Sequence, residues 1–172
     1  MLEKKSEFTI FPIPVLEDNI VWVWVHNCNA VVVDPSISTP VKEWLSKKKL
    51  SLVAILQTHH HEDHIGGTKE LIKSWPRAKV IASKKDIKRI PFQTFSVVNN
   101  DIFHLFDSEI KVIEVHGHTN NHIAFYISKR DSKYNILFPG DTLFGGGCGR
   151  LLEGTASQMF DSLNKLNSLP KD

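Results

Sequence analysis

The amino-acid sequence predicts one layered α/β domain with mixed or antiparallel sheets. The chain has 172 residues, of which 41% are hydrophobic, and this is enough to build one ordinary core. Short runs rich in Val, Ile and Phe recur between Pro, Gly, Asn and Asp residues, as β-strands do. A few segments with helical spacing of apolar residues lie among these runs. We therefore expect a single domain over residues 1–172, with helices layered on sheets.

The expected strands are short and are bounded by turn-forming residues. The run from Ile20 to His26 is typical, because valines alternate with tryptophans in it and an asparagine flanks it at each end. The full set of expected strands covers residues 8–13, 20–26, 30–34, 52–58, 79–82, 110–115, 122–128 and 134–139.

Three helices are expected. The first covers 40–49, with Thr39 as its N-cap and Pro40 at the first helical position. The second covers 68–75 and ends before Pro76, which cannot continue a helix. The third, near the end of the chain, carries apolar residues at helical spacing, namely Met159, Phe160, Leu163 and Leu166.

Composition excludes several classes of protein. A formal net charge of +2 gives no strong field for nucleic acid or an anionic membrane. The longest apolar stretch, Ile20 to Val25, is far shorter than the roughly 20 residues of a membrane span, and no signal-peptide pattern follows Met1. Two cysteines, Cys28 and Cys148, are too few for a disulfide framework. We expect a cytoplasmic monomer that binds neither nucleic acid nor membrane.

Histidines gather in one segment, where four of the nine lie within six residues. The segment follows an apolar strand and precedes a helix, and loops at strand ends are held in place by the sheet. Residues two apart in extended backbone project to the same side, so His59 and His61 can bind one ion together. Asp63 and His64 point to a second ion beside the first. His60 faces the opposite way and is not an expected ligand.

Imidazole and carboxylate are the ligands that suit Zn²⁺, Fe or Mn²⁺, whereas Ca²⁺ and Mg²⁺ prefer oxygen alone. A lone histidine on a strand is usually a surface or packed residue. The pattern H-x-H-x-D-H before Gly-Gly is explained poorly by chance, so it predicts a metal site. Two later strand ends could complete that site, at 116–122 and at Gly140-Asp141-Thr142. The second of these is weak by itself and is more often a plain turn.

These segments resemble the metallo-β-lactamase superfamily and, within it, the hydroxyacylglutathione hydrolases, also called glyoxalase II. The resemblance runs over nearly the whole chain. The histidine segment is specific only to the superfamily, whereas GDTLF with GCGR and EGT is much more specific to glyoxalase II. The matching segments are LEDN at 16–19, VVVDP at 31–35, THHHEDHIGG at 58–67, GHTNNH at 117–122, and FPGDTLFGGGCGR with LLEGT at 138–155.

The resemblance implies a four-layer αββα sandwich with a two-metal site at one edge. The implied ligands of the first metal are His59, His61, His118 and the bridging Asp141. The implied ligands of the second metal are Asp63, His64 and the same Asp141. The metals would be two divalent cations, zinc first, with iron or manganese compatible with the same ligands.

The resemblance also implies the reaction. The substrate would be a glutathione thioester, typically S-D-lactoylglutathione, hydrolysed to D-lactate and glutathione in methylglyoxal detoxification. A metal-bound hydroxide would attack the thioester carbonyl, and a metal ion would stabilise the oxyanion. The planar, permanently charged guanidinium of Arg150 would bind a carboxylate of the glutathione part. The alternative is that Arg150 is a surface residue with no contact to the substrate.

The chain departs from the family pattern in three places. It ends at Asp172, so we expect it to lack the C-terminal strand with a further histidine ligand and the helical substrate domain. Leu152 stands where an aromatic residue commonly lines the substrate pocket, and Glu62 stands where an apolar or aromatic residue is frequent. We therefore expect a weak second metal site and low thioester activity in this shortened chain.

Three alternatives share these motifs. A glutathione persulfide dioxygenase uses one iron and molecular oxygen on the same fold, but the GCGR and EGT segments argue against it. A nucleic-acid phosphodiesterase also carries H-x-H-x-D-H, and the low net charge argues against it. The third alternative is a catalytically weak metal-binding fragment of the same fold.

Overall fold

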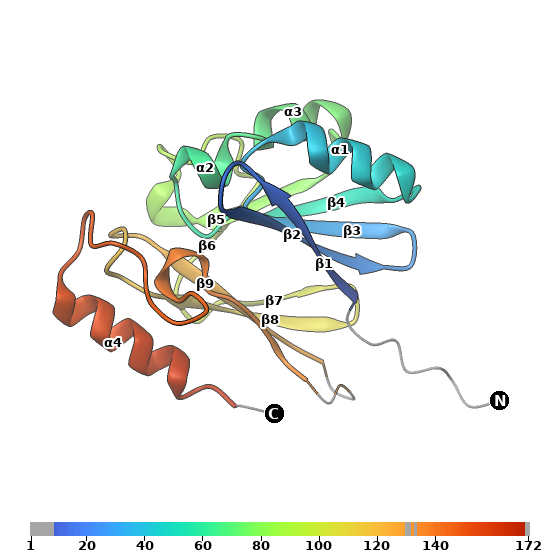
Figure 1. Cartoon of the computed structure of the whole chain (residues 1–172). Helices are drawn as coiled ribbons and strands as arrows, with labels where there is room; N and C mark the ends of the chain where they lie inside the picture. The colour runs from blue at the N-terminus through green and yellow to red at the C-terminus, as the bar shows by residue number, and fades with distance from the viewer. Residues whose placement is uncertain (1–8, 130–131, 133, 171–172) are drawn as a thin grey trace. The chain divides into compact units, whose positions relative to one another are not determined.

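The computed structural model describes residues 9–129, 132 and 134–170 (Figure 1). These residues form two compact units. One unit ends at Val97 and is called here the N-terminal unit, and the other begins at Val98 and is called the C-terminal unit. Each unit combines one sheet with helices, as a layered α/β fold requires.

The N-terminal unit contains a six-stranded sheet in the order β1-β2-β3-β4-β5-β6. Strands β1 to β3 are antiparallel neighbours, whereas β3 to β6 run parallel to one another. The strands are β1 Thr9–Val15, β2 Asn19–His26, β3 Asn29–Val33, β4 Ser51–Leu56, β5 Lys79–Ser83 and β6 Phe95–Val97.

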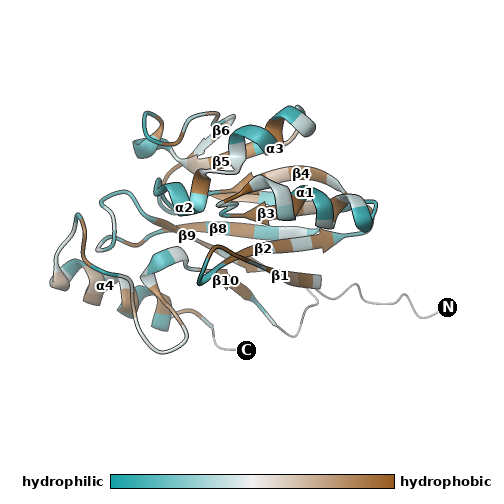
Figure 2. Ribbon diagram, turned by 45° about the horizontal axis from the view of Figure 1, so that its top comes forward, coloured by the Kyte–Doolittle hydropathy of each residue, from teal (hydrophilic) through white to brown (hydrophobic). Residues whose placement is uncertain are grey.

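Helices connect the parallel strands of this unit, and α1 and α3 cover one face of its sheet (Figure 1). Their apolar residues Val41, Leu45 and Leu71 are fully buried in a core built on the valines and isoleucines of the sheet, and their outer faces are hydrophilic (Figure 2). The helical segments are α1 Ser38–Lys47, α2 Glu62–Ile65, α3 Thr68–Ser74 and the 3₁₀ turn η1 Lys84–Asp86.

The parallel strands β3, β4 and β5 place their carboxyl ends at the same edge of the sheet. The chain leaves β3 at Asp34, leaves β4 into residues 57–61, and leaves β5 into η1. Polar groups that follow different strands are therefore brought to one edge, where open α/β sheets usually bind ligands.

The C-terminal unit contains a four-stranded antiparallel sheet in the order β10-β9-β8-β7. Helix α4 begins at a capping box made by Thr155 and Gln158, and its Leu166 joins a buried cluster with Ile113 and Ala124. The elements are β7 Ile102–Leu105, β8 Ser108–Glu114, β9 Ile123–Ser128, β10 Ile136–Phe138, the 3₁₀ turn η2 Gly140–Thr142 and α4 Ala156–Asn167.

The expected strands are confirmed, with ends that differ by up to two residues, but β6 and β7 were not expected. These two strands have only three and four residues. A run so short offers too few positions to show the alternation that identifies a strand.

The expected start of the first helix is wrong. Helix α1 begins at Ser38, its N-cap is Ile37, and no side chain caps it, so Thr39 is not the N-cap and Pro40 is not the first helical residue. Proline is tolerated here because the N–H groups of the first helical turn have no partner within the helix.

The expected apolar face of the last helix is also partly wrong. Phe160 is 65% exposed, whereas Met159, Ser162 and Leu166 form the buried side of α4. Those three residues lie on one side of the helix. Phe160 is the residue after Met159, so its side chain points away from that side.

Among the helices of the described residues, none has the length and apolar character needed to cross a membrane.

Candidate metal centre

The segment after β4 brings two histidine rings together. His59 Nε2 and His61 Nδ1 lie 3.0 Å apart, and His59 is completely buried. The centroids of the two rings lie 4.7 Å apart, so the side chains share one side of the segment. Two ring nitrogens this close can share either a proton or a cation.

The second nitrogen of His59 is held by the protein. His59 Nδ1 lies 3.0 Å from Thr58 Oγ1, and the Thr58 hydroxyl donates to Asp34 Oδ2 at 2.6 Å. Because that hydroxyl uses its single hydrogen on the carboxylate, its oxygen accepts from His59 Nδ1–H. The ring therefore carries its proton on Nδ1 and presents the lone pair of Nε2 toward His61.

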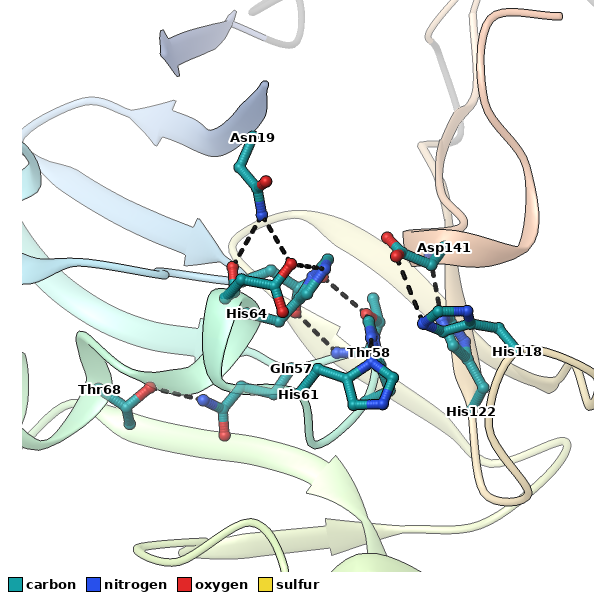
Figure 3. A network of polar contacts seen from close by, with 12 residues as sticks. Asn19, Gln57, Thr58, His61, His64, Thr68, His118, His122 and Asp141 are labelled. Carbon is teal, nitrogen blue, oxygen red and sulfur yellow. Dashed lines mark hydrogen bonds and ion pairs between the residues drawn. The ribbon is translucent and has the colours of Figure 1, made fainter. Parts of the chain in front are cut away.

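The next two expected ligands lie on the short helix α2. His64 Nε2 and Asp63 Oδ2 are 3.6 Å apart, so these donor atoms can meet at one ion. The other ring nitrogen, His64 Nδ1, lies 3.1 Å from Asp34 Oδ2. Asn19, the first residue of β2, donates to the carbonyl oxygen of Asp63 at 3.0 Å and to its Oδ2 at 3.1 Å (Figure 3).

Asp34 was not assigned a role from the sequence, yet it supports His59 through Thr58 and contacts His64 directly. Its carboxylate accepts from the backbone N–H of Thr58 at 2.8 Å, in addition to the contacts with the Thr58 hydroxyl and His64. It lies at the end of β3 with a φ of 50°, a left-handed conformation that Asp adopts more readily than most residues. The sequence signal was an acidic residue directly after a buried valine strand.

The glycines after the histidine segment allow close packing. A Cβ on Gly67 would lie 2.7 Å from the carbonyl oxygen of Pro35, which accepts a hydrogen bond from the Gly67 N–H. The start of α3 is thereby drawn against the chain that carries Asp34.

The C-terminal unit contributes a second pair of donor atoms. His118 Nδ1 donates to the carbonyl oxygen of Arg150 at 2.8 Å, which leaves Nε2 as the lone-pair nitrogen. That Nε2 lies 3.4 Å from Asp141 Oδ2 (Figure 3). His118 is buried and Asp141 is half-buried, so the pair keeps access to one side.

Two further residues, His122 and Gly149, hold this pair in place. The N–H of Asp141 donates to His122 Nε2 at 3.1 Å, and His122 is fully buried. Gly149 donates its N–H to the Asp141 carbonyl oxygen at 2.9 Å. A Cβ at Gly149 would lie 2.1 Å from that oxygen and 3.0 Å from His118 Nδ1, so only glycine fits there. The neighbouring Gly147 has open space around it.

Arg150 acts on this pair through its backbone. Its carbonyl oxygen holds His118, and the residue itself is exposed. The expected contact between its side chain and glutathione stays a prediction.

The donor atoms fit a divalent metal. In the N-terminal unit, ligand atoms of Asp34, His59 and His64 all lie within 4.8 Å of one another. In three histidines, His59, His64 and His118, one ring nitrogen contacts an oxygen atom of the protein. The other ring nitrogen faces a second possible ligand atom, on His61, Asp63 or Asp141. This is the usual arrangement of metal-binding histidines.

Comparison with known proteins gives the family context. Residues 14–172 match the metallo-β-lactamase superfamily. A protein of Prochlorococcus marinus (strain NATL2A) named hydroxyacylglutathione hydrolase is 78% identical over 172 residues, which are 100% of this chain and 68% of that protein.

Solved structures show the same fold at low sequence identity. A metallo-β-lactamase of Staphylococcus aureus matches with a TM-score of 0.78 and 22% identity over 96% of this chain and 53% of its own. The protein TTHA1623, solved in a di-iron-bound form, matches with a TM-score of 0.74 and 24% identity over 93% of this chain and 87% of its own. The metallo-β-lactamase fold that the sequence predicted is therefore confirmed.

Proposed function

The chain belongs to the metallo-β-lactamase superfamily and, within it, to the hydroxyacylglutathione hydrolase family, and we propose on this premise that it hydrolyses glutathione thioesters with the help of divalent metal ions. The observation that carries the proposal is the pairing of donor atoms in both units. The pairs are His59 with His61, Asp63 with His64, and His118 with Asp141.

The proposed ligands divide into two sets. His59, His61, His118 and Asp141 would hold the first ion, and Asp63, His64 and Asp141 would hold the second. Zinc is the proposed metal, because imidazole and carboxylate suit it, and iron or manganese would fit the same donors. Such ions lower the pKa of a bound water and polarise a carbonyl oxygen, which is the chemistry that thioester hydrolysis needs.

The surrounding residues prepare these ligands. Asp34 and Thr58 keep the proton of His59 on Nδ1, and the carbonyl oxygen of Arg150 does the same for His118. In each ring Nε2 is left with its lone pair, as a metal ligand requires. Asn19 supports this arrangement by orienting the carboxylate of Asp63 with two hydrogen bonds.

The proposed substrate is S-D-lactoylglutathione or a related thioester, with a role in methylglyoxal detoxification. The Arg150 guanidinium would bind a carboxylate of the glutathione part. We expect Arg150→Ala to raise KM about tenfold with little change in kcat, and Arg150→Lys to raise KM less. Steady-state kinetics on both variants checks this, and an unchanged KM in Arg150→Ala would remove Arg150 from the substrate site.

We also propose a cytoplasmic, monomeric protein. Both cysteines, Cys28 and Cys148, are free thiols on the surface, which suits a reducing compartment. A single species of monomer mass in solution is the expected outcome of a light-scattering measurement.

The direct test is hydrolysis of S-D-lactoylglutathione by the zinc-loaded chain, followed through loss of the thioester and release of free thiol. Turnover that a chelator abolishes and zinc restores is the expected result. No turnover on any glutathione thioester with metal bound would overturn the proposal. Oxygen uptake on glutathione persulfide by the iron-loaded chain would favour the dioxygenase alternative instead.

We further propose that the second ion binds weakly in this chain. Its proposed protein ligands are only Asp63, His64 and the shared Asp141, so water must fill more of its coordination sphere. Stepwise zinc titration by calorimetry should therefore show one tighter and one weaker binding step. Two steps of equal affinity would contradict this.

A further inference from the structure

We propose that Asp86 and Arg89 are positioning residues for the metal ligands and that they act through His60, which is not itself a ligand. These three residues are called the His60 clamp. The proposal rests on the proposed function only in taking His59 and His61 as metal ligands, because none of the three clamp residues belongs to the proposed ligand set.

The clamp is a compact polar group in the N-terminal unit. Arg89 donates to Asp86 Oδ1 from Nε at 2.8 Å and from Nη2 at 2.6 Å. The third guanidinium nitrogen, Nη1, lies 3.3 Å from His60 Nε2, and His60 Nδ1 lies 3.7 Å from Asp86 Oδ2. The ring of His60 is therefore placed between the cation and the carboxylate of one ion pair, whose carboxylate is buried.

The hydrogen-bonding groups around His60 determine which of its ring nitrogens carries the proton. A guanidinium has donors only, so His60 Nε2 must accept the hydrogen bond with its lone pair. The ring proton then sits on Nδ1, on the side that faces the Asp86 carboxylate. The Nε2 lone pair thus faces the Arg89 guanidinium and the Nδ1–H faces the Asp86 carboxylate. A flip of the ring by 180° would place its N–H against Arg89.

The ion pair is a rigid support. The Asp86 side chain is 0% exposed, while the Arg89 side chain is 36% exposed, so the carboxylate is the fixed centre of the clamp. The backbone carbonyl oxygen of Asp86 also accepts from the N–H groups of Arg89 at 2.9 Å and Ile90 at 2.8 Å. The turn after β5 is therefore held by its main chain as well as by the ion pair.

The clamp joins the loops that follow two neighbouring strands. Strands β4 and β5 are paired in parallel, so the histidine segment after β4 and the turn η1 after β5 leave the same edge of the sheet. His60 lies between His59 and His61 in the chain, and its ring centroid is 4.8 Å from that of His61 and 6.5 Å from that of His59. Fixing the ring of His60 therefore fixes the peptide units on both sides of it, and these units aim the two proposed ligands.

The experiment measures metal binding rather than turnover. The full chain carrying His60→Phe keeps the ring volume, loses both ring nitrogens and leaves the Asp86–Arg89 pair intact. We expect its zinc affinity, measured by competition with a chelator, to fall between 10-fold and 100-fold, as is typical when groups that orient metal ligands are removed. Circular dichroism and thermal unfolding of the zinc-free protein establish that the variant is folded.

Two further variants and a matched control complete the test. His60→Gln can still accept from Arg89 and donate toward Asp86, so it should recover most of the lost affinity. Arg89→Ala should lower the affinity, whereas Lys88→Ala, which removes a positive charge from the adjacent exposed residue, should leave it unchanged. If Arg89→Ala fails to fold because Asp86 is left buried without its partner, the double variant Asp86→Asn with Arg89→Ala replaces it.

The outcomes separate this inference from the proposed function. Native zinc affinity in folded His60→Phe overturns the clamp, whatever the thioester activity is. Reduced affinity in His60→Phe and Arg89→Ala, with recovery in His60→Gln, supports it even if no thioester is hydrolysed. Equal losses in His60→Phe and His60→Gln would also overturn it, because the polar contacts of the ring would then be irrelevant.

Discussion

The two units hold their proposed metal ligands in different ways. In the N-terminal unit four ligands come from one segment, residues 59–64, and side chains from other strand ends support them, chiefly Asp34. In the C-terminal unit His118 and Asp141 are 23 positions apart along the chain and are held mainly by backbone groups of Arg150, Gly149 and Asp141 itself. The first group is therefore sensitive to the charge of its supporting residues, and the second to the path of the main chain.

The largest effect is expected when a ligand is removed from either unit. His59→Ala and His118→Ala should each lower thioester turnover at least about 100-fold, because a ligand matters more than the groups that orient it. Turnover and zinc content per chain are the measurements. His104→Ala, an exposed histidine on β7, is the matched control and should change neither. A large loss for only one of the two ligand variants would show that one unit alone carries the chemistry.

The next effect should be specific to the N-terminal unit. Asp34→Asn keeps the shape of the side chain but replaces one accepting oxygen by an NH₂ group. The Asp34 carboxylate accepts from Thr58 and His64, so the new NH₂ group would face hydrogen-bond donors. We expect the free energy of unfolding to fall by about 2–3 kcal/mol and zinc affinity to fall with it. Denaturant titration checks this against Asp18→Asn, an exposed residue. Equal stability of the two variants would argue against a structural role for the charge.

The corresponding test in the C-terminal unit changes the main-chain packing. Gly149→Ala adds a Cβ that would lie 2.1 Å from the Asp141 carbonyl oxygen, so the chain must shift beside His118. We expect a loss of about 1–3 kcal/mol in unfolding free energy, with reduced turnover. Gly147→Ala meets no neighbouring atom and should be close to neutral. If the two variants unfold alike, the close approach at Gly149 does not constrain the site.

The smallest expected effect concerns Asn19. Asn19→Ala removes two hydrogen bonds to Asp63, a proposed ligand of the second ion only. We expect about a tenfold loss of affinity for the second ion and none for the first, which corresponds to about 1.4 kcal/mol. Stepwise zinc titration by calorimetry separates the two ions, and Glu17→Ala in the turn that precedes β2 is the control. Loss of the first ion would mean that Asn19 supports the whole segment rather than Asp63.

The candidate ligands of the N-terminal unit could be proposed from the sequence because they are close together in the chain. The spacing of His59, His61, Asp63 and His64 follows from the geometry of an extended segment that enters a helix, so local rules are enough. His118 and Asp141 gained their roles only through the family resemblance, because nothing local connects two positions separated by a hairpin. The structure places His118 Nε2 and Asp141 Oδ2 3.4 Å apart within the C-terminal unit, and their role as metal ligands stays a prediction.

The supporting residues could not be predicted, since their roles depend on which strands are neighbours. Asp34 and Asp86 each follow a strand, as many surface acids do, and only the parallel pairing of β3, β4 and β5 brings them to the histidine segment. Which glycine of the 145–149 segment is closely packed depends on the position of the Asp141 carbonyl oxygen, which lies beside Gly149. Strand order and main-chain path are tertiary properties, and a local sequence pattern does not contain them.

The turn between β2 and β3 offers a practical handle on the protein. Cys28 lies in this turn with its thiol free and exposed, at the amino end of β3, whereas Asp34 follows the carboxyl end of that strand. Five residues of strand separate the two ends, roughly 16 Å of chain. A fluorescent or spin label attached there, in a chain whose Cys148 has been replaced by serine, would sit remote from the ion-binding edge and could follow its rearrangements without disturbing them.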